Sequence, residues 1–242
     1  MAITPSADAG RAILAVRDVV KDYRGLRPLR VRRLVVREGE IVSVLGFDAV
    51  EAEVMVGLAT GGVLPDQGDV AIFGEPTAAI DTPERWLESL DRIGLVSGRT
   101  VLIDELSVAQ NIAVPLTLDL DPIAEPVRRE VSRLAADAGI DAASRDHRVG
   151  DVPPDVRARV HVARALALQP RLLLLEHATA ALPPGGGTAF GTLVSRLAKT
   201  RGLSVLALTA DERFAAALGG RRMSWTAATG DVRSVRGWAR WF

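Results

Sequence analysis

The sequence predicts an α/β protein with a mainly parallel sheet, because short apolar runs alternate with helical patterns in both halves of the chain. Two of these runs, 172–175 and 203–208, are apolar throughout, as is typical of strands buried on both faces. A third, 41–45, ends at Gly46 and leads into a helical pattern. Between about 100 and 155 the pattern is helical. We therefore expect one domain, 12–242, with a helical subdomain at about 100–155 inserted in the α/β core.

The first half supplies most of the expected strands. Residues 13–20 and 29–36 are β-rich, and arginines interleaved in the second run predict one face in water. A helix is expected at 50–59, ended by paired glycines, and a strand at 69–73. Thr82 followed by Pro83 has the pattern of an N-cap with proline at the first helical position, so we expect a helix from there to about 90. A short strand is expected at 93–96.

The second half begins with helices. The stretch from 106 to about 142 has a helical pattern, and apolar stripes at spacings of three and four lie within 123–134 and 156–167. After the strand at 172–175, a helix is expected at 188–199, and the strand at 203–208 follows. A last strand is expected at 231–235.

Composition excludes several classes of protein. The 242 residues are 48% hydrophobic and 25% charged with a net charge of zero, so bulk electrostatic binding to nucleic acid or anionic lipid is not indicated. The chain has no cysteine, which excludes disulfides and thiolate chemistry. No apolar run reaches the roughly 18–20 residues of a membrane span, and the first eleven residues lack the pattern of a secretory signal. We expect a cytoplasmic protein.

The strand and turn that end at Gly46 stand where a phosphate-binding P-loop belongs. The P-loop pattern is G-x-x-x-x-G-K-[ST]. Laid on it, Gly46 matches the first glycine. Glu51 stands in place of the second glycine, Ala52 in place of the lysine and Glu53 in place of the Ser or Thr. The scaffold of a phosphate site is present without its side-chain chemistry.

From about residue 13 to 235 the chain resembles the ATP-binding cassette (ABC) subunits of membrane transporters. The resemblance is carried by Pro-Asp-Gln-Gly-Asp-Val at 65–70, by 106–116, by Arg-Val-His-Val-Ala-Arg-Ala-Leu at 159–166 and by the four leucines at 172–175. It implies a P-loop NTPase core with antiparallel strands near the N-terminus. Segment lengths resemble most closely the lipid-transport and lipoprotein-release types.

The motifs that carry catalysis in this family all differ here. Besides the P-loop, the differences fall at Gly98 in place of the glutamine, at Pro153 and Pro154 within the signature, at Glu176 in place of the Walker B Asp, at His177 in place of the catalytic Glu, at Pro183 in place of the D-loop Asp and at Ala210 in place of the switch His. Because the residues between them match, misalignment does not explain the differences.

These differences predict lost or weak binding of ATP and Mg²⁺, hence no cofactor and no catalytic residue. A P-loop directs backbone N–H groups and a lysine at phosphates. Here the lysine is missing and Asp48, Glu51 and Glu53 add like charge. Either Glu51 or Glu53 takes the place of the phosphate and caps the helix, or the loop has simply drifted.

Four residues have two interpretations each, with Glu53 and Glu176 taken together. His177 is a base or, as we prefer, a tolerated polar residue. Glu53 and Glu176 together suit Mg²⁺, which is the less favoured reading. Tyr23, the only tyrosine, lies where the family places the aromatic residue that stacks on adenine, or it is a core or edge residue.

The resemblance also implies partners. In the family each ATP lies between the P-loop of one subunit and the signature of another, so neither a homodimer nor a heterodimer with an intact ABC subunit would have a complete site. A groove for the integral membrane permease subunit is expected at 98–115, with Gly98, Asn111 and Pro115 as candidates. The tail 233–242, rich in Trp and Arg, is a second interface candidate or packs on its own domain.

The sequence thus predicts a catalytically inactive ABC subunit, a pseudo-ATPase, with a structural or regulatory role in a membrane transport complex, peripheral on the cytoplasmic face of the inner membrane. Nucleic acid is not expected as a partner. Two alternatives remain: a nucleotide-binding sensor that does not hydrolyse, and an active ABC transporter ATPase.

Overall fold

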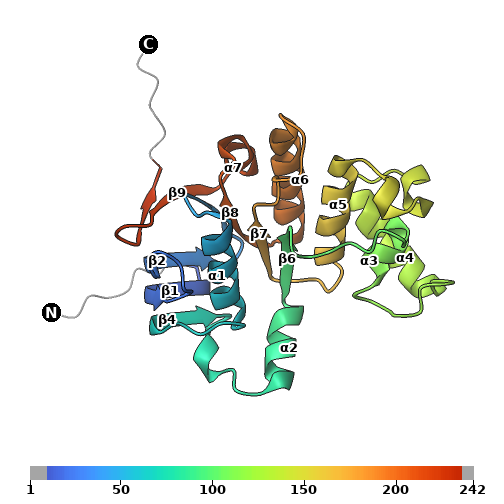
Figure 1. The fold of residues 1–242 in the computed structure, drawn as a ribbon. Helices are drawn as coiled ribbons and strands as arrows, with labels where there is room; N and C mark the ends of the chain where they lie inside the picture. Colours follow the sequence, from blue (N-terminus) through green and yellow to red (C-terminus); the bar gives the residue numbers. More distant parts are fainter. Residues whose placement is uncertain (1–9, 236–242) are drawn as a thin grey trace, which may run out of the picture.

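A computed structural model describes residues 10–235, which form two sheets with helices around them (Figure 1). The four-stranded sheet has the order β2-β1-β4-β5 and is antiparallel throughout. Its strands are β1 (Ala12–Lys21), β2 (Leu29–Arg37), β4 (Gln67–Ile72) and β5 (Glu75–Pro76). On β2 the arginines at 30, 32 and 33 are exposed and alternate with buried apolar residues, which confirms the expected wet face.

The six-stranded sheet has the order β10-β9-β3-β8-β7-β6 and is parallel from β9 to β6. Its strands are β3 (Ile41–Leu45), β6 (Ile93–Ser97), β7 (Leu172–Glu176), β8 (Ser204–Thr209), β9 (Arg221–Thr226) and β10 (Asp231–Ser234). β10 pairs antiparallel with β9 at one edge. All residues of β7 and β8 are buried, as their apolar sequences predict. The predicted α/β fold with a mainly parallel sheet and antiparallel N-terminal strands is confirmed.

Helices pack around this sheet and extend beyond it. They are α1 (Ala49–Thr60), α2 (Pro83–Asp91), α3 (Val108–Ala113), α4 (Glu125–Asp137), α5 (Pro154–Ala165), α6 (Gly186–Arg201) and α7 (Glu212–Leu218). In Figure 1, α3, α4 and α5 gather at the end of the molecule opposite the antiparallel sheet. Their position agrees with a helical insert, and the subdomain boundaries at about 100 and 155 stay a prediction.

The start of α2 follows the expectation from sequence closely. The Thr82 side chain accepts a hydrogen bond from the backbone N–H of Arg85, and Pro83 is the first helical residue. The side chain therefore satisfies one of the donors that a helix start leaves free. The indole Nε1 of Trp86 donates to the carbonyl oxygen of Thr60, 3.0 Å away, and joins α2 to the end of α1.

Three expectations about elements were wrong or incomplete. The segment 106–142 is not a single helix, because α3 ends at Ala113 and α4 begins only at Glu125. Ile123 was expected in a helical stripe but lies before the first residue of α4. Pro115 and Pro122, which have no backbone N–H, lie between the two helices, and Pro126 lies in the first turn of α4, where a proline is tolerated. The short α7 and the half-buried β9 were not predicted from the sequence. Residues 236–242 of the proposed interface tail lie outside the described residues.

Within residues 10–235, no helix has both the length and the apolar character needed to cross a membrane.

Candidate functional site

Four neighbouring parallel strands end at one edge of the large sheet, and the residues that follow them lie together there. Leu45 at the end of β3 is in register with Thr209 at the end of β8, and Ser97 at the end of β6 with Glu176 at the end of β7. In open α/β sheets, ligands bind at this carboxyl edge. Gly46, which matches the P-loop pattern, and Gly98, His177 and Ala210, which differ from the ABC pattern, therefore come from distant parts of the chain to one side of the sheet.

The turn after β3 is fixed by its glycine and by an aromatic stack. Gly46 has a φ of 109°, and a Cβ at this position would lie 2.5 Å from the carbonyl oxygen of Trp225. Only glycine permits both the angle and the close approach. The next residue, Phe47, is buried and stacks on the Trp225 ring with 4.2 Å between ring centroids. β9, which carries Trp225, thus holds the loop in shape.

Two carboxylates close the start of α1. The backbone N–H of Glu51 donates to Asp48 Oδ1 at 2.7 Å, and the backbone N–H of Asp48 donates to Glu51 Oε2 at 3.0 Å. This reciprocal arrangement is a capping box. The self-capping interpretation is confirmed for Glu51, which is buried, and it is wrong for Glu53, whose side chain points elsewhere.

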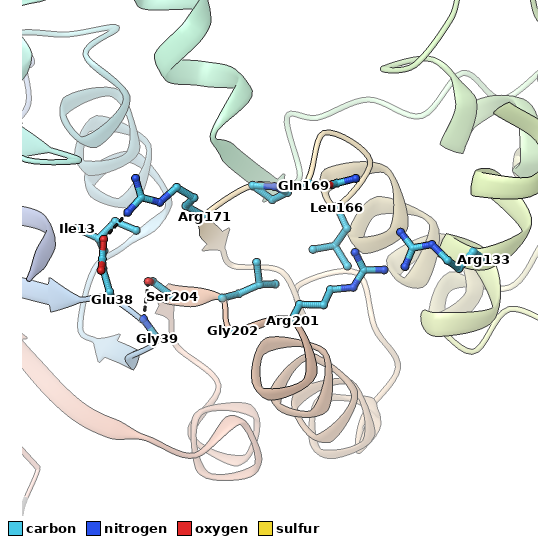
Figure 2. Close-up of a pocket in the computed structure, with 12 residues that line it drawn as sticks. Ile13, Glu38, Gly39, Arg133, Leu166, Gln169, Arg171, Arg201, Gly202 and Ser204 are labelled. Carbon is cyan, nitrogen blue, oxygen red and sulfur yellow. Dashed lines mark hydrogen bonds and ion pairs between the residues drawn. The ribbon is translucent and has the colours of Figure 1, made fainter. Parts of the chain in front are cut away.

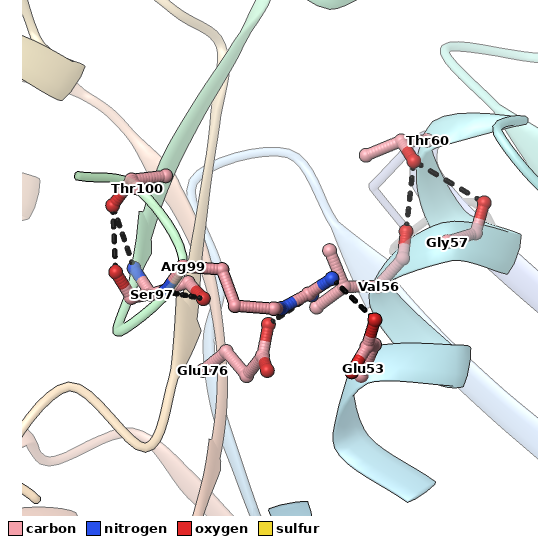
Figure 3. Close-up of polar contacts among 8 residues, drawn as sticks. All are labelled: Glu53, Val56, Gly57, Thr60, Ser97, Arg99, Thr100 and Glu176. Atoms are coloured by element: carbon pink, nitrogen blue, oxygen red, sulfur yellow. Dashed lines mark hydrogen bonds and ion pairs between the residues drawn. The ribbon is translucent and has the colours of Figure 1, made fainter. Parts of the chain in front are cut away.

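Arg99 joins the two other acidic positions of the site. Its guanidinium donates to Glu53 Oε1 at 2.8 Å and to Glu176 Oε2 at 2.6 Å (Figure 3). Glu176 is buried at the end of β7, whereas Glu53 is half exposed on α1. The pKa of Arg99 is raised, and its hydrogen bond to Glu176 is the largest cause. Sequence reasoning missed Arg99, because no local pattern marks a side chain whose partners lie 46 and 77 residues away.

Ala52 and Tyr23 flank the capped loop. Ala52 is fully buried against the core, so the position of the P-loop lysine presents no side chain to the site. Tyr23 is half buried, and its ring packs against the backbone of Gly25, where a Cβ would lie 2.5 Å from it. Burial, then the negative charges of Glu51 and Asp48, raise the pKa of the Tyr23 phenol. The tyrosine is therefore close enough to the loop to feel its carboxylates.

His177 follows Glu176 directly and is held in an unusual backbone conformation. Its φ is 42°, uncommon for a residue with a Cβ, while its backbone N–H donates to the carbonyl oxygen of Leu208 at 2.9 Å. Its Nε2 is buried and has no hydrogen-bond partner within the described residues. The side chain shares a small cavity with Thr209, Ala210 and Asp211. The choice between a base and a tolerated polar residue stays open.

The remaining positions have structural roles in the described residues. Pro153 precedes and Pro154 begins α5, as suits a residue without a backbone donor. Pro183 accepts a hydrogen bond from the backbone N–H of Gly186 in the turn before α6. Ala210 is exposed, and Asp211 next to it caps α7 by accepting from the backbone N–H of Phe214 at 2.9 Å.

The expected partner groove is only partly accessible. Gly98 is exposed and Pro115 is half buried, whereas Asn111 is fully buried. Its side-chain amide accepts from the backbone N–H of Ile103 and donates to the carbonyl oxygens of Ile103, Leu106 and Ser107. Asn111 therefore organises the segment from within and cannot contact a partner. Val101 and Ile103, exposed on the same segment, are the apolar side chains available there.

A cavity of about 570 Å³ lies at the opposite, amino edge of the parallel strands (Figure 2). Glu38 and Arg171, which line it, form an ion pair. The lining arginines 133 and 201 both pair with Asp137. Because these cations are already neutralised and ligands favour the carboxyl edge, this cavity is not the candidate site.

Comparisons with known proteins agree with the fold. No protein-family model matches the chain. It is 31% identical over 204 residues to the methionine import ATP-binding protein MetN of Caulobacter vibrioides, covering 81% of this chain and 59% of that protein. It is 32% identical over 213 residues to methionine import ATP-binding protein MetN 2 of Burkholderia mallei, covering 86% of this chain and 52% of that protein. The chain thus spans between half and three fifths of these relatives.

Solved structures show the same fold. The dimeric structure of MJ0796, a bacterial ABC transporter cassette, superposes with a TM-score of 0.75 at 24% identity, covering 93% of this chain and all of that one. A post-hydrolysis state of MJ0796 bound to ADP and Pi gives a TM-score of 0.76, also at 24% identity and with the same coverage of both chains. The chain has the ABC ATPase cassette fold, and the resemblance to ABC nucleotide-binding subunits is confirmed.

The expectation of an inactive, nucleotide-free subunit is corrected by these findings. Relatives that match four fifths of the chain are named ATP-binding proteins. This contradicts the predictions of a pseudo-ATPase, of a protein that is not an enzyme and of lost ATP and Mg²⁺ binding. The prediction counted side chains at motif positions. It treated the backbone scaffold as insufficient without those side chains.

The residues present fit a bound nucleotide in part. The Gly46 turn, the start of α1 and a buried carboxylate at the end of β7 provide the scaffold on which P-loop proteins hold phosphates and Mg²⁺. No set of three or more His, Asp or Glu side chains among residues 10–235 is arranged to hold a metal ion. Mg²⁺ is commonly bound by one or two carboxylates together with substrate phosphates. Glu53 and Glu176 are carboxylates at such positions, but both are already ion-paired with Arg99. The loop itself contributes no lysine.

Proposed function

We propose that this chain is the ATP-binding subunit of a membrane import system and works as an ABC ATPase. The observation that carries the proposal is the cassette fold combined with similarity over four fifths of the chain to methionine import ATP-binding proteins. Methionine, or a solute of similar chemistry, is the substrate class that these relatives suggest. The names of the relatives favour import over the lipid-transport and lipoprotein-release types that segment lengths suggested.

In this proposal the nucleotide binds at the carboxyl edge of the parallel strands. Tyr23 offers a ring for the adenine, and the phosphates lie near the start of α1, where the helix dipole favours anions and the capping box of Asp48 and Glu51 already takes two backbone N–H groups. Glu176 faces the same space from β7. Bound Mg·ATP would supply the phosphoanhydride whose hydrolysis drives transport.

The same proposal includes a membrane permease partner and a second cassette subunit, identical or different. The permease would dock on the segment 98–115, where Val101 and Ile103 expose apolar surface beside the site. The chain would then lie on the cytoplasmic face of the inner membrane. Arg99 belongs to this segment and contacts Glu176 of the site. Docking of the permease and binding of the nucleotide would therefore both involve the turn 97–100.

Calorimetry with ATP and ADP in the presence of MgCl₂ tests nucleotide binding by the full chain. We expect saturable binding, and a loss of about tenfold or more in Tyr23→Ala, because stacking of a base on an aromatic ring contributes about 1–3 kcal/mol. Tyr23→Phe retains the ring and serves as the control. Absence of heat and of any thermal shift at millimolar nucleotide would overturn the proposal.

Release of phosphate from ATP tests the enzymatic part, measured with the chain alone and with a membrane permease that co-purifies with it. We expect turnover that rises when the permease is present and that falls in Glu176→Gln. Saturable ATP binding with no turnover in either preparation would reject the ATPase.

A further inference from the structure

The turn after β6 places Arg99 at the candidate site. In residues 97–100 the backbone N–H of Thr100 donates to the carbonyl oxygen of Ser97 at 3.0 Å, and the Thr100 hydroxyl donates to the same oxygen at 2.7 Å. The backbone N–H of Arg99 donates to the Ser97 hydroxyl at 3.1 Å. With the bond from the Ser97 N–H to the Thr100 hydroxyl, four hydrogen bonds within four residues fix the direction in which the Arg99 side chain leaves the turn, as Figure 3 shows.

The guanidinium of Arg99 is only partly used by its two carboxylate partners. It makes one contact to Glu53 and one to Glu176, each through a different terminal nitrogen. A guanidinium has five N–H donors in a rigid fork. The side chain is 47% exposed, so donors remain on the side that faces solvent. Arg99 is thus held in place by protein carboxylates while it still presents a charged, planar edge.

The charge balance of the site gives this edge a role. Asp48, Glu51, Glu53 and Glu176 bring four carboxylates to the loop and the end of β7, and Ala52 brings no cation. Within residues 10–235, no other arginine or lysine forms an ion pair with Glu53 or Glu176. A polyphosphate approaching this edge meets carboxylates that outnumber the one guanidinium, so the contact with Arg99 is the favourable unit interaction there, worth roughly 1–4 kcal/mol at about 4 Å.

The positions of the two carboxylates explain why Arg99 is well placed. Glu53 takes the position of the P-loop Ser or Thr, and Glu176 that of the Walker B Asp. In P-loop proteins these two positions hold the ion that bridges the β- and γ-phosphates. A guanidinium held between them therefore lies beside the space that the terminal phosphates would take.

We propose that Arg99 is the phosphate-binding cation of this site, supplied by the turn after β6 in place of a lysine from the loop. Its ligand is the polyphosphate chain of a nucleotide, which the planar fork of an arginine suits. The inference rests on the proposed nucleotide site. The competing role is that of a strut, in which Arg99 only neutralises Glu53 and Glu176 and joins α1 to β7.

Titration of the full chain with inorganic tripolyphosphate, ATP and adenosine, in MgCl₂, separates the two roles. The variants are Arg99→Gln and Arg99→Lys. Arg85→Gln is the matched control, because Arg85, on the surface of α2, also forms ion pairs with two carboxylates, those of Glu75 and Asp81. Circular dichroism and thermal unfolding check that each variant is folded.

We expect Arg99→Gln to weaken tripolyphosphate and ATP binding at least tenfold and to leave adenosine binding within twofold. Arg99→Lys should recover part of the loss, and Arg85→Gln should match the wild type. A strut predicts lower thermal stability in Arg99→Gln with phosphate affinity unchanged, and that result would overturn the inference while leaving the proposed function intact. If the wild-type chain binds neither ATP nor tripolyphosphate, the proposed function fails first.

Glu53→Gln gives a second test that does not depend on the stability of Arg99→Gln. Removing this partner frees one edge of the guanidinium, so tripolyphosphate should bind a few times more tightly. The gain should shrink in the double variant Glu53→Gln with Arg99→Lys, because the guanidinium fork is then missing. An equal gain with and without Arg99 would mean that Glu53 acts only through its own charge, and it would count against the inference.

Discussion

Helices α1 and α3 begin with the same hydrogen-bonded device built from different chemistry. At α1 the pair is Asp48 and Glu51, and at α3 it is Ser107 with Gln110. In both, the first side chain accepts from the third helical N–H and the second side chain accepts from the N-cap N–H. The α1 pair is charged and the α3 pair is neutral.

The difference in charge distinguishes the candidate site at α1 from the structural support at α3. The neutral start of α3 is completed by the buried Asn111, whose bonds all go to nearby backbone. The charged start of α1 lies at the carboxyl edge of the sheet beside two more carboxylates that Arg99 joins. The capping geometry is therefore the same at both helix starts. Only the start of α1 carries charged groups with which an outside ligand can interact electrostatically. Four measurements can break or sharpen this comparison.

The largest effect is expected at the support. Asn111→Ala would leave the backbone N–H of Ile103 and several carbonyl oxygens without partners in a buried place. We expect the free energy of unfolding to fall by about 3 kcal/mol, because each buried unsatisfied group costs about 1–3 kcal/mol. Urea unfolding measures it, with the exposed Gln169→Ala as control. A loss below about 1 kcal/mol would show that water replaces the amide easily.

Acid should weaken the contact between α5 and the turn 97–100. Burial, then the positive charges of Arg164 and Arg157, lower the pKa of His161 from 6.5 to about 4. Between these values the unfolded chain binds a proton that the folded chain does not, so this stability is complete above pH 6.5 and is lost as pH falls towards 4. We expect a loss on the order of 2 kcal/mol.

His161→Gln isolates that contribution. The variant removes the titrating ring that faces Thr100 at 3.4 Å, while the other acid-sensitive groups remain. The difference in unfolding free energy between wild type and variant, measured by urea at pH 7, 5.5 and 4.5, should change in favour of the variant as pH falls. Parallel curves would show that His161 titrates normally.

The caps of α1 and α3 should contribute equally to the free energy of unfolding when only the capping side chain is removed. Asp48→Ala and Ser107→Ala each delete a side-chain acceptor at a helix start, which typically costs about 1 kcal/mol. Asp48→Asn preserves the acceptor and should stay within about 0.5 kcal/mol of the wild type. A much larger cost for Asp48→Asn than for Ser107→Ala, measured by thermal unfolding, would mean that the charge itself holds α1.

The smallest effect is the response to salt. Glu53→Gln should lower the unfolding free energy by about 1 kcal/mol or less at low ionic strength, because the Arg99–Glu53 pair that it breaks is half exposed. Near 1 M salt, where charges are screened beyond about 3 Å, the difference should shrink. The cost of Ser107→Ala should not change with salt. If both costs respond alike, the charged and neutral starts do not differ as described.

Individual helices and strands show which parts of the fold can be predicted from the sequence. The buried strands and the Thr82 start of α2 were predictable, because apolar runs and capping residues act over a few neighbours. The break between α3 and α4 was missed, since apolar spacing continued across prolines. The β9 strand was missed because its burial depends on packing of Trp225 against Phe47 in the loop.

By itself the sequence determined the α/β fold, the Gly46 turn and the absence of a lysine in the loop. Those features depend on local patterns and on backbone geometry that few residues permit. Only the tertiary structure decided that Glu51 closes the helix start, that Asn111 is an internal support and that Arg99 lies between Glu53 and Glu176. The charge of a site is the sum over segments that folding brings together, and a motif read along one segment does not contain it.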